Sequence, residues 1–194
     1  MREFPDWLAA TLASDASEGQ GVLPGYILPL QAASRVVGPV RVALMGQDDN
    51  LVMRQVLDTP PAPGTVLVVA GGSTSRSAII GGLLTLEIQN AGVAGFVTDG
   101  LVRDSQEIRQ SGLGVWCRGV TPIASQKKGP ARVGGSVSIG GIVIRDGDLV
   151  IADDDGVVIW PQEQITALLT KAEAKFQKDN TRLAQLQQAQ KRTE

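Results

Sequence analysis

Residues 65–98, TVLVVAGGSTSRSAIIGGLLTLEIQNAGVAGFVT, contain the pattern that decides the fold. Residues 65–70 form a short, β-branched and almost entirely apolar run, which is typical of a strand covered on both faces. Apolar residues recur with helical spacing over 77–90, and 94–98 is a second buried strand. A strand, a helix and a strand within about 35 residues predict a βαβ unit whose two strands run parallel.

Shorter elements are expected on both sides of this unit. Glycine and proline punctuate residues 21–39, which predicts a loop, and the run PPAPG at 60–64 ends the helix before it. The other expected elements are helices within the first twenty residues, at 48–58 and at 104–111, and strands at 40–46 and 114–117.

After Pro122 the pattern changes to short strands separated by RDGD and DDDG turns, which predicts hairpins. Residues 162–191 predict one long helix with a heptad-like apolar stripe. That helix either lies on its own domain or reaches a neighbouring subunit, because its glutamine-rich distal half has little local core to cover. The strands of this region are expected at 132–138, 141–144, 149–152 and 156–160.

The composition excludes several classes of chemistry. The chain has no histidine, which removes Ser–His–Asp and Cys–His catalysis and every His-ligated metal site. With 18 basic and 20 acidic residues, and only three Trp, three Phe and one Tyr to stack on bases, we expect no direct nucleic-acid binding. No apolar run approaches the roughly 20 residues that span a bilayer, so we expect no membrane partner. The single cysteine, Cys117, suits a reducing cytoplasm.

The strongest candidate site follows the second buried strand, at the place where α/β sheets usually bind ligands. Arg103 offers a planar fork of donors that suits a carboxylate. Asp104 and Glu107 are three residues apart and would share one helical face, where their oxygens could hold a hard cation such as magnesium. The same spacing also describes a capping box, with Asp104 at the N-cap, Glu107 at N3 and no role in catalysis.

Two glycine pairs form a second candidate site. The turn Gly71–Ser77 follows a strand and precedes the expected helix, so its free amide hydrogens predict an anion site. It lacks the Gly-Lys-Ser/Thr of a phosphate loop. Gly81 and Gly82, inside the helical pattern, cost about 1 kcal/mol each relative to alanine, which indicates close backbone approach, an interrupted helix or a tolerated packing pair.

Two other features have simpler interpretations. The run Asp153–Asp155 lacks the alternating ligand spacing of a calcium loop, so we expect a solvated hairpin turn. Cys117 has no histidine to activate it and follows two apolar residues, so we expect a buried structural thiol.

The ordered motifs resemble those of the RraA-like family, which contains the regulator of ribonuclease activity A and metal-dependent 4-hydroxy-4-methyl-2-oxoglutarate/4-carboxy-4-hydroxy-2-oxoadipate aldolases. The likeness rests on VLVVAGGSTSRSAIIGGLLTLEIQNAGVAGFVTDGLVRDSQEIRQSGLGVWCRGVTP, followed by GDLVIADDDGVVIWP. It implies an α/β fold with a swivelling β/β/α domain, here one domain over 1–194 with a core at about 14–161 and a C-terminal helix at about 162–191. It also implies a homotrimer or hexamer with the active site between subunits.

The resemblance also gives the candidate residues their roles. Asp104 would bind Mg²⁺ or Mn²⁺, Arg103 would hold the pyruvyl group and stabilise its enolate, and Glu107 would support them. The substrate's oxygens would contact the backbone amides around a turn formed by Gly81, Gly82, Leu83 and Leu84.

The chain departs from the family's aldolase branch at position 82. The resemblance places an acidic residue there, twenty intervening residues before the Arg103-Asp104 pair, where this chain has Gly82. Loss of an outer group beside a metal costs about 10–100-fold in metal affinity or activity. We therefore expect the substitution Gly82→Asp to tighten magnesium binding.

These inferences predict a cytoplasmic, divalent-metal-dependent lyase that acts on a small 2-oxo acid through a pyruvate enolate. The reaction would be aldol cleavage of 4-hydroxy-4-methyl-2-oxoglutarate, decarboxylation of oxaloacetate, or both. A magnesium ion and the Arg103 guanidinium would share the charge of the enolate. The alternative, from a different class, is a non-catalytic regulator that binds a protein partner such as ribonuclease E.

Overall fold

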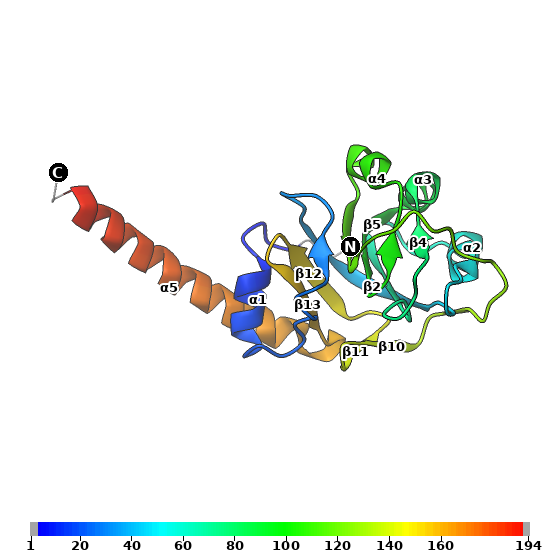
Figure 1. The fold of residues 1–194 in the computed structure, drawn as a ribbon. Coiled ribbons are helices and arrows are strands. Elements are labelled where there is room, and N and C mark those ends of the chain that lie inside the picture. The colour runs from blue at the N-terminus through cyan, green and yellow to red at the C-terminus, as the bar shows by residue number, and fades with distance from the viewer. Residues whose placement is uncertain (1–3, 192–194) are drawn as a thin grey trace.

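A central sheet organises the fold (Figure 1). The computed structural model describes residues 4–191. The sheet runs in the order β1-β7-β5-β3-β2-β12-β13, and β9 pairs with β2 beside this path. Its strands are β1 (Leu28–Pro29), β2 (Val36–Leu44), β3 (Thr65–Ala70), β5 (Val93–Thr98), β7 (Gly114–Cys117), β9 (Arg132–Val133), β12 (Leu149–Asp153) and β13 (Gly156–Trp160).

The predicted pair of parallel strands is confirmed. β3 pairs in parallel with β5, β5 with β7, and β2 with β3, so four neighbouring strands share one direction. β3 is buried along its whole length, as its continuous apolar run predicted. The carboxyl ends of these strands therefore meet at one edge of the sheet, where the stretches that carry the candidate residues begin.

β2 begins at Val36, whereas the sequence predicted a loop up to residue 39. Its first residues pair antiparallel with β12, from Val36 opposite Ala152 to Pro39 opposite Leu149. Gly38 fits inside the strand because a Cβ there would lie 2.6 Å from the carbonyl oxygen of residue 64. The glycine that indicated a loop is thus required by close packing within the sheet.

The stretch 21–29 nearly closes the sheet into a barrel. Val22 bridges to Val158 of β13, and Leu28 pairs with Cys117 of β7 near the opposite end of the strand order. Both contacts are made by one piece of chain, so it links the two outer parts of the sheet. This piece also lies in the region that the sequence predicted to be a loop.

The expected hairpins are confirmed. β10 (Ser136–Ile139) pairs antiparallel with β11 (Ile142–Arg145), and β12 pairs antiparallel with β13. The strand expected over 132–138 is divided, because Gly134 and Gly135 adopt positive φ between β9 and β10. The β10–β11 hairpin contributes apolar side chains to the same buried cluster as β2, β3 and β12, so it covers one side of the central sheet.

The single helix predicted over 77–90 is a strand followed by a helix. β4 (Ala78–Ile80) is fully buried and pairs in parallel with β6 (Leu101–Val102), which pairs in turn with β8 (Gly119–Val120). The helix begins only after Gly81. The apolar spacing fits both structures, but the β-branched residues of β4 find strand partners, and this pairing overrides the helical pattern.

The helices and the hairpin pack around three buried apolar clusters. α2, α3 and α4 share one cluster with β3 and β5, while α1 and α5 share another with β12 and β13. Among residues 4–191, no helix is both long and apolar enough to cross a membrane. The helix bounds are α1 (Ala10–Ala16), α2 (Leu51–Asp58), α3 (Gly82–Asn90), α4 (Ser105–Ser111) and α5 (Ile165–Lys191), the last preceded by a 3-10 turn at Gln162–Gln164.

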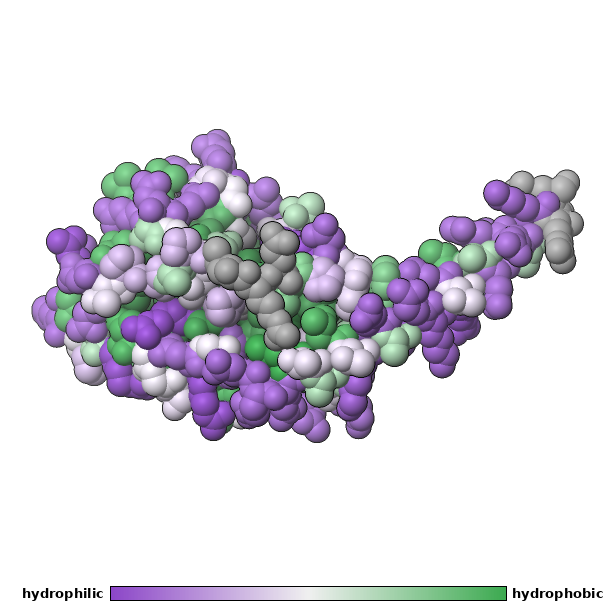
Figure 2. Space-filling view, turned by 180° about the vertical axis from the view of Figure 1, so that it is seen from behind, coloured by the Kyte–Doolittle hydropathy of each residue, from purple (hydrophilic) through white to green (hydrophobic). Residues whose placement is uncertain are grey.

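The two halves of α5 lie in different surroundings. The first half packs against α1 and the β12–β13 hairpin, and its Phe176 stacks on Trp7 with ring centroids 5.0 Å apart. Every residue from 180 to 191 is exposed, and this half projects from the body as a mostly hydrophilic arm (Figures 1 and 2). The helix therefore lies on its own domain over its first half only.

Candidate active site

A small second sheet carries the candidate residues. β4, β6 and β8 form this sheet, beyond the carboxyl ends of β3, β5 and β7. β4 leads into Gly81 and Gly82, and β6 leads directly into Arg103 and Asp104. The Arg103 N–H donates to the Ile80 carbonyl oxygen at 3.0 Å, so the sheet holds these two stretches side by side.

Arg103, Asp104 and Gly82 meet at this point. The Asp104 Oδ2 accepts a hydrogen bond from the Gly82 N–H at 3.1 Å, and the Arg103 Nε lies 3.7 Å from the same oxygen. The side chains of Arg103 and Asp104 are 42% and 45% exposed. An ion pair this exposed contributes only about 0–1 kcal/mol to folding, so both charges stay available to a ligand.

The backbone of Asp104 is left-handed, with φ 52° and ψ 46°. This region is unfavourable for most residues other than glycine, although aspartate tolerates it. Asp104 occupies the N-cap position of α4, but its side chain makes no capping hydrogen bond there. The capping box that the spacing allowed is therefore not formed, and the carboxylate contacts Gly82 instead. Backbone strain of this kind is concentrated at functional sites.

Gly81 and Gly82 allow a close approach that a side chain would block. A Cβ at Gly81 would lie 2.4 Å from the Asp104 Oδ2, and a Cβ at Gly82 would lie 2.8 Å from the Glu107 Cβ. Of the interpretations of this glycine pair, the structure shows both close approach and an interrupted helix, because α3 begins only at Gly82. The second contact also bears on the predicted effect of Gly82→Asp, because an added Cβ would require α3 or α4 to shift.

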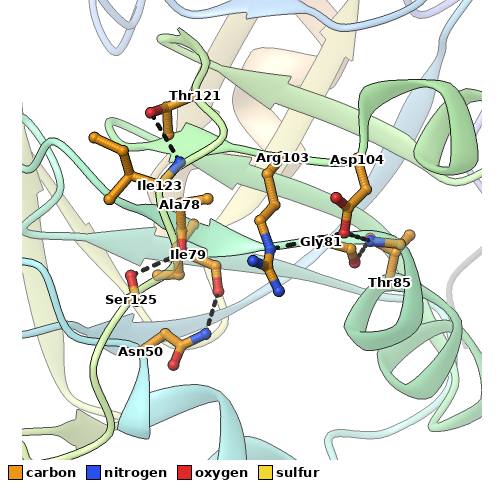
Figure 3. Close-up of polar contacts among 11 residues, drawn as sticks. Asn50, Ala78, Ile79, Gly81, Thr85, Arg103, Asp104, Thr121, Ile123 and Ser125 are labelled. Carbon is orange, nitrogen blue, oxygen red and sulfur yellow. Dashed lines mark hydrogen bonds and ion pairs between the residues drawn. The ribbon is translucent and has the colours of Figure 1, made fainter.

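Arg103 and Asp104 line a pocket of about 280 Å³. Figure 3 shows the Arg103 side chain pointing between Asp104 on one side and Asn50 and Ser125 on the other. A larger pocket of about 450 Å³, between α1 and α5, contains none of the candidate residues. The residues that line the smaller pocket are Asn50, Ala78, Ile80, Gly81, Leu83, Leu84, Glu87, Arg103, Asp104, Ala124, Ser125 and Lys127.

Three residues that line this pocket were not predicted from the sequence: Asn50, Ser125 and Lys127. The Asn50 Nδ2 donates to the Ile79 carbonyl at 2.9 Å, whereas its Oδ1 is buried without a hydrogen-bond partner among the residues described. The Ser125 Oγ donates to the Ala78 carbonyl at 2.7 Å. One available signal was that Asn50 follows β2, because polar residues after neighbouring parallel strands gather at the same edge of a sheet.

The predicted anion site at the first glycine turn, Gly71–Ser77, is filled by the chain itself. Oδ1 of Asp99 accepts the Gly72 N–H at 2.7 Å, and its Oδ2 accepts the Gly71 N–H at 3.4 Å. The turn also leads into β4 and not into a helix. The prediction of a site for an external anion is therefore wrong, because Asp99 accepts the amides at the start of the turn and Asp48 accepts those at its end.

The pKa values of the two carboxylates that bind this turn are shifted in opposite directions. Burial raises the pKa of Asp99, although the N–H groups of Gly72 and Gly71 act against that shift. At the other end of the turn, Asp48 accepts hydrogen bonds from Ser77 and Arg76 at 2.9 and 2.7 Å, and these lower its pKa. Asp99 therefore holds a charge under less favourable conditions than Asp48 does.

Two minor predictions can be compared with the structure. Cys117 is buried as expected, and burial raises the pKa of its thiol. The Asp153–Asp155 turn, which was expected only to be solvated, also makes structural contacts. Asp153 accepts the N–H of Ala10, at the start of α1, at 2.8 Å, and Asp154 accepts the N–H of Ala33 at 2.8 Å. The turn therefore anchors two distant segments.

The donors at the pocket fit a hard divalent cation of the magnesium type. Such ions are held in proteins by one or two carboxylates, while water and substrate oxygens complete the shell. Asp104 offers one half-exposed carboxylate at the pocket wall. Within residues 4–191 no three acidic or cysteine side chains are grouped closely enough to bind a metal together. A cation here would therefore depend on water and substrate for most of its ligands.

The sequence and the fold match a known family. The RraA-like family model, described as Aldolase/RraA, matches residues 10–159. Because the match covers most of the chain, the protein belongs to the RraA-like family. Its α/β architecture, with a nearly closed sheet and a long C-terminal helix, is the swivelling β/β/α fold of that family.

Similar proteins have two kinds of name. A Halalkalibacterium halodurans protein named "Putative 4-hydroxy-4-methyl-2-oxoglutarate aldolase" is 35% identical over 90% of this chain and 83% of the relative. A Thermus thermophilus 4-hydroxy-4-methyl-2-oxoglutarate aldolase is 34% identical over 75% of this chain and 87% of the relative. The structure of Streptomyces coelicolor RraAS2, an unusual member of the RNase ES inhibitor RraA protein family, matches with a TM-score of 0.81 and 27% identity, over 92% and 93% of the two chains.

Proposed function

We propose that this protein is a divalent-metal-dependent lyase that cleaves or decarboxylates a small 2-oxo acid through the enolate of pyruvate. One observation carries the proposal: the Arg103 guanidinium and the Asp104 carboxylate share a pocket wall with Gly81, Leu83 and Leu84. The aldolase names of two relatives support the class of reaction. We place the enzyme in the cytoplasm, as a homotrimer or hexamer.

Arg103 would bind the 2-oxo acid and stabilise the enolate. A guanidinium forms two parallel hydrogen bonds to adjacent oxygens, which suits a carboxylate next to a carbonyl. When the carbon–carbon bond breaks, its electron pair moves toward the 2-oxo oxygen. A fixed positive charge at that oxygen stabilises the transition state more than the substrate, and this difference is what accelerates the reaction.

Asp104 would hold Mg²⁺ or Mn²⁺. When bound, the cation supplies a second positive charge to the oxygens that become negative in the reaction. The Gly82 N–H fixes the Asp104 Oδ2 at 3.1 Å, and the left-handed backbone turns the carboxylate away from its own helix. Glu107 would support this arrangement by packing close to Gly82, where an added Cβ would lie 2.8 Å from the Glu107 Cβ, so that α3 and α4 approach closely.

The first turn of α3 would orient the substrate. The N–H groups at the start of a helix have no partner within it, so the amides around Gly81, Leu83 and Leu84 are suited to the substrate's oxygens, whereas the Gly82 N–H already donates to the Asp104 carboxylate. Lys127 and Asn50 line the same pocket from other loops. We propose that they bind the part of the substrate that lies beyond the pyruvyl group.

A non-catalytic regulator is the second candidate function. Gly82 stands where the resemblance to the aldolases places an acid, and Leu83, beside the pocket, is 83% exposed. An exposed leucine suits contact with a protein better than contact with a small dianion. The Streptomyces coelicolor neighbour is named as a member of an RNase ES inhibitor family. This alternative predicts binding to a ribonuclease E-type partner and no turnover.

The test is pyruvate release from oxaloacetate and from 4-hydroxy-4-methyl-2-oxoglutarate, with Mg²⁺ or with a chelator. We expect turnover that needs the metal and is lost in Arg103→Ala. Arg145→Ala, an exposed arginine on the β10–β11 hairpin, is the matched control and should behave as wild type. Turnover that survives Arg103→Ala would remove that residue from its role, and no turnover by wild type would favour the regulator.

A further inference from the structure

The two halves of the site are carried by two separate turns. The turn Gly71–Ser77 connects β3 to β4 and so delivers Gly81 and Gly82. The shorter turn at Asp99 and Gly100 connects β5 to β6 and delivers Arg103. The relative position of these two turns therefore fixes how the amides of one half face the charged side chains of the other.

The two turns are in direct contact through backbone and side chain. A Cβ at Gly72 would lie 2.5 Å from the Gly100 Cα, so the two backbones touch and only glycine fits. The buried Asp99 side chain, 4% exposed, accepts the N–H groups of Gly72 and Gly71. The turn after β5 thus binds the amides of the turn after β3.

Arg118 joins the same two turns from a third direction, between β7 and β8. Its Nη2 donates to the Ser75 carbonyl at 2.6 Å and to the Gly72 carbonyl at 3.3 Å. Its Nε donates to the Asp99 carbonyl at 3.2 Å, and its backbone N–H donates to the Gly100 carbonyl at 3.0 Å. The guanidinium therefore bonds to carbonyl oxygens of both turns.

We propose that Asp99 and Arg118 are positioning residues for the reaction, an inference that rests on the proposed function. Neither residue lines the pocket, so each acts through the stretches it holds. Asp99 fixes the amides of one turn, and Arg118 fixes carbonyls of both. Together they keep the Gly82 N–H opposite the Asp104 carboxylate. A displacement of about 1 Å at such a contact reduces turnover on the order of 100-fold.

The experiment compares Arg118→Ala with Arg35→Ala. Arg35 is a matched control, because its guanidinium also donates to two backbone carbonyls, those of Pro5 and Leu8, away from the site. In Arg118→Ala we expect kcat to fall about 10–100-fold with a smaller change in KM, measured well below the unfolding temperature. We expect Arg118→Lys, which keeps one donor group, to recover part of that loss.

Hydrogen exchange of the Gly82 N–H, followed by NMR, gives a second measurement that does not require turnover. We expect the exchange rate of this amide to be at least about tenfold higher in Arg118→Ala than in wild type. In Arg35→Ala the exchange rate should equal that of wild type. If wild type has no lyase activity, faster exchange still supports the positioning role while the proposed function fails. Unchanged exchange and unchanged kcat in Arg118→Ala, even with lowered stability, would overturn the positioning role.

Discussion

The two glycine pairs of this chain follow buried strands, yet they differ in what their amides meet. Gly71 and Gly72 face the buried carboxyl group of Asp99. Gly81 and Gly82 face the half-exposed Asp104 beside a pocket. The first pair is closed by the protein itself, whereas the second keeps its acidic partner accessible. A glycine turn after a strand is thus suited to a ligand site only if the acid that binds its amides stays accessible.

The largest effect is expected at the closed turn. Asp99→Ala should lower the free energy of unfolding by about 2–4 kcal/mol, because the buried Gly72 N–H and the partly buried Gly71 N–H lose their acceptor. Asp99→Asn keeps an acceptor for Gly72 and removes a charge whose burial is unfavourable, so it should lose less than half as much. Urea unfolding of the two variants checks this. Equal losses would mean that the charge, and not the hydrogen bond, holds the turn.

A smaller stability change is expected at Gly82. A methyl group there meets the Glu107 Cβ, which cannot swing aside as the end of a side chain can. Gly82→Ala should therefore cost about 1–3 kcal/mol by overpacking. Gly25→Ala is the control, since its added Cβ has no neighbour within 4 Å, and it should stay within about 0.5 kcal/mol of wild type. A neutral Gly82→Ala would show that α4 moves freely.

Gly81→Ala should separate stability from function. Its Cβ meets the Asp104 Oδ2, which is the mobile end of a side chain, so the carboxylate can turn away. Stability should change by less than about 1 kcal/mol, because the displaced ion pair is exposed. Mn²⁺ affinity, measured by calorimetry, should fall about tenfold or more. Unchanged affinity would mean that Asp104 is not the ligand.

The smallest expected effects are on how the free energy of unfolding depends on pH. The two carboxylates of the closed turn, Asp99 and Asp48, change it in opposite directions. The pKa of Asp99 is raised by burial in the folded state, so its contribution makes the protein more stable as the pH falls through that pKa. The pKa of Asp48 is lowered, so its contribution is present above the unfolded value of 3.8 and is lost as the pH falls below it. The free energies of unfolding of wild type and Asp99→Asn, plotted against pH, should converge toward neutral pH. Plots that stay parallel would show that Asp99 does not have a raised pKa in the folded state.

Strand pairing explains which parts of the fold the sequence could predict. The parallel pair β3–β5 and the β12–β13 hairpin follow from local apolar pattern and turn residues, and both are confirmed. β4 and the start of β2 were missed, because each is a strand only through partners far away in the chain. Local spacing cannot distinguish a short buried strand from a helical turn when the partner supplies the decisive hydrogen bonds.

Likewise, only part of the candidate site could be predicted from the sequence. Arg103 and Asp104 are adjacent in sequence after a buried strand, and the structure places them beside Gly81 and Gly82. The filling of the first turn by Asp99 could not be derived, because nothing local shows which acid reaches which amides. Lys127 was missed for a related reason, since a loop lysine is interpreted as solvated until its neighbours are known.

The projecting half of α5 has a consequence for how the molecule melts. A helical segment of about 12 residues is marginal in water when nothing packs on it, so in an isolated chain residues 180–191 owe their helical shape to continuity with the anchored half. Their helical content should decline gradually on warming, before the body unfolds in one cooperative step. Shortening the arm, or joining a reporter to its tip, should therefore leave the midpoint of that later step where it was.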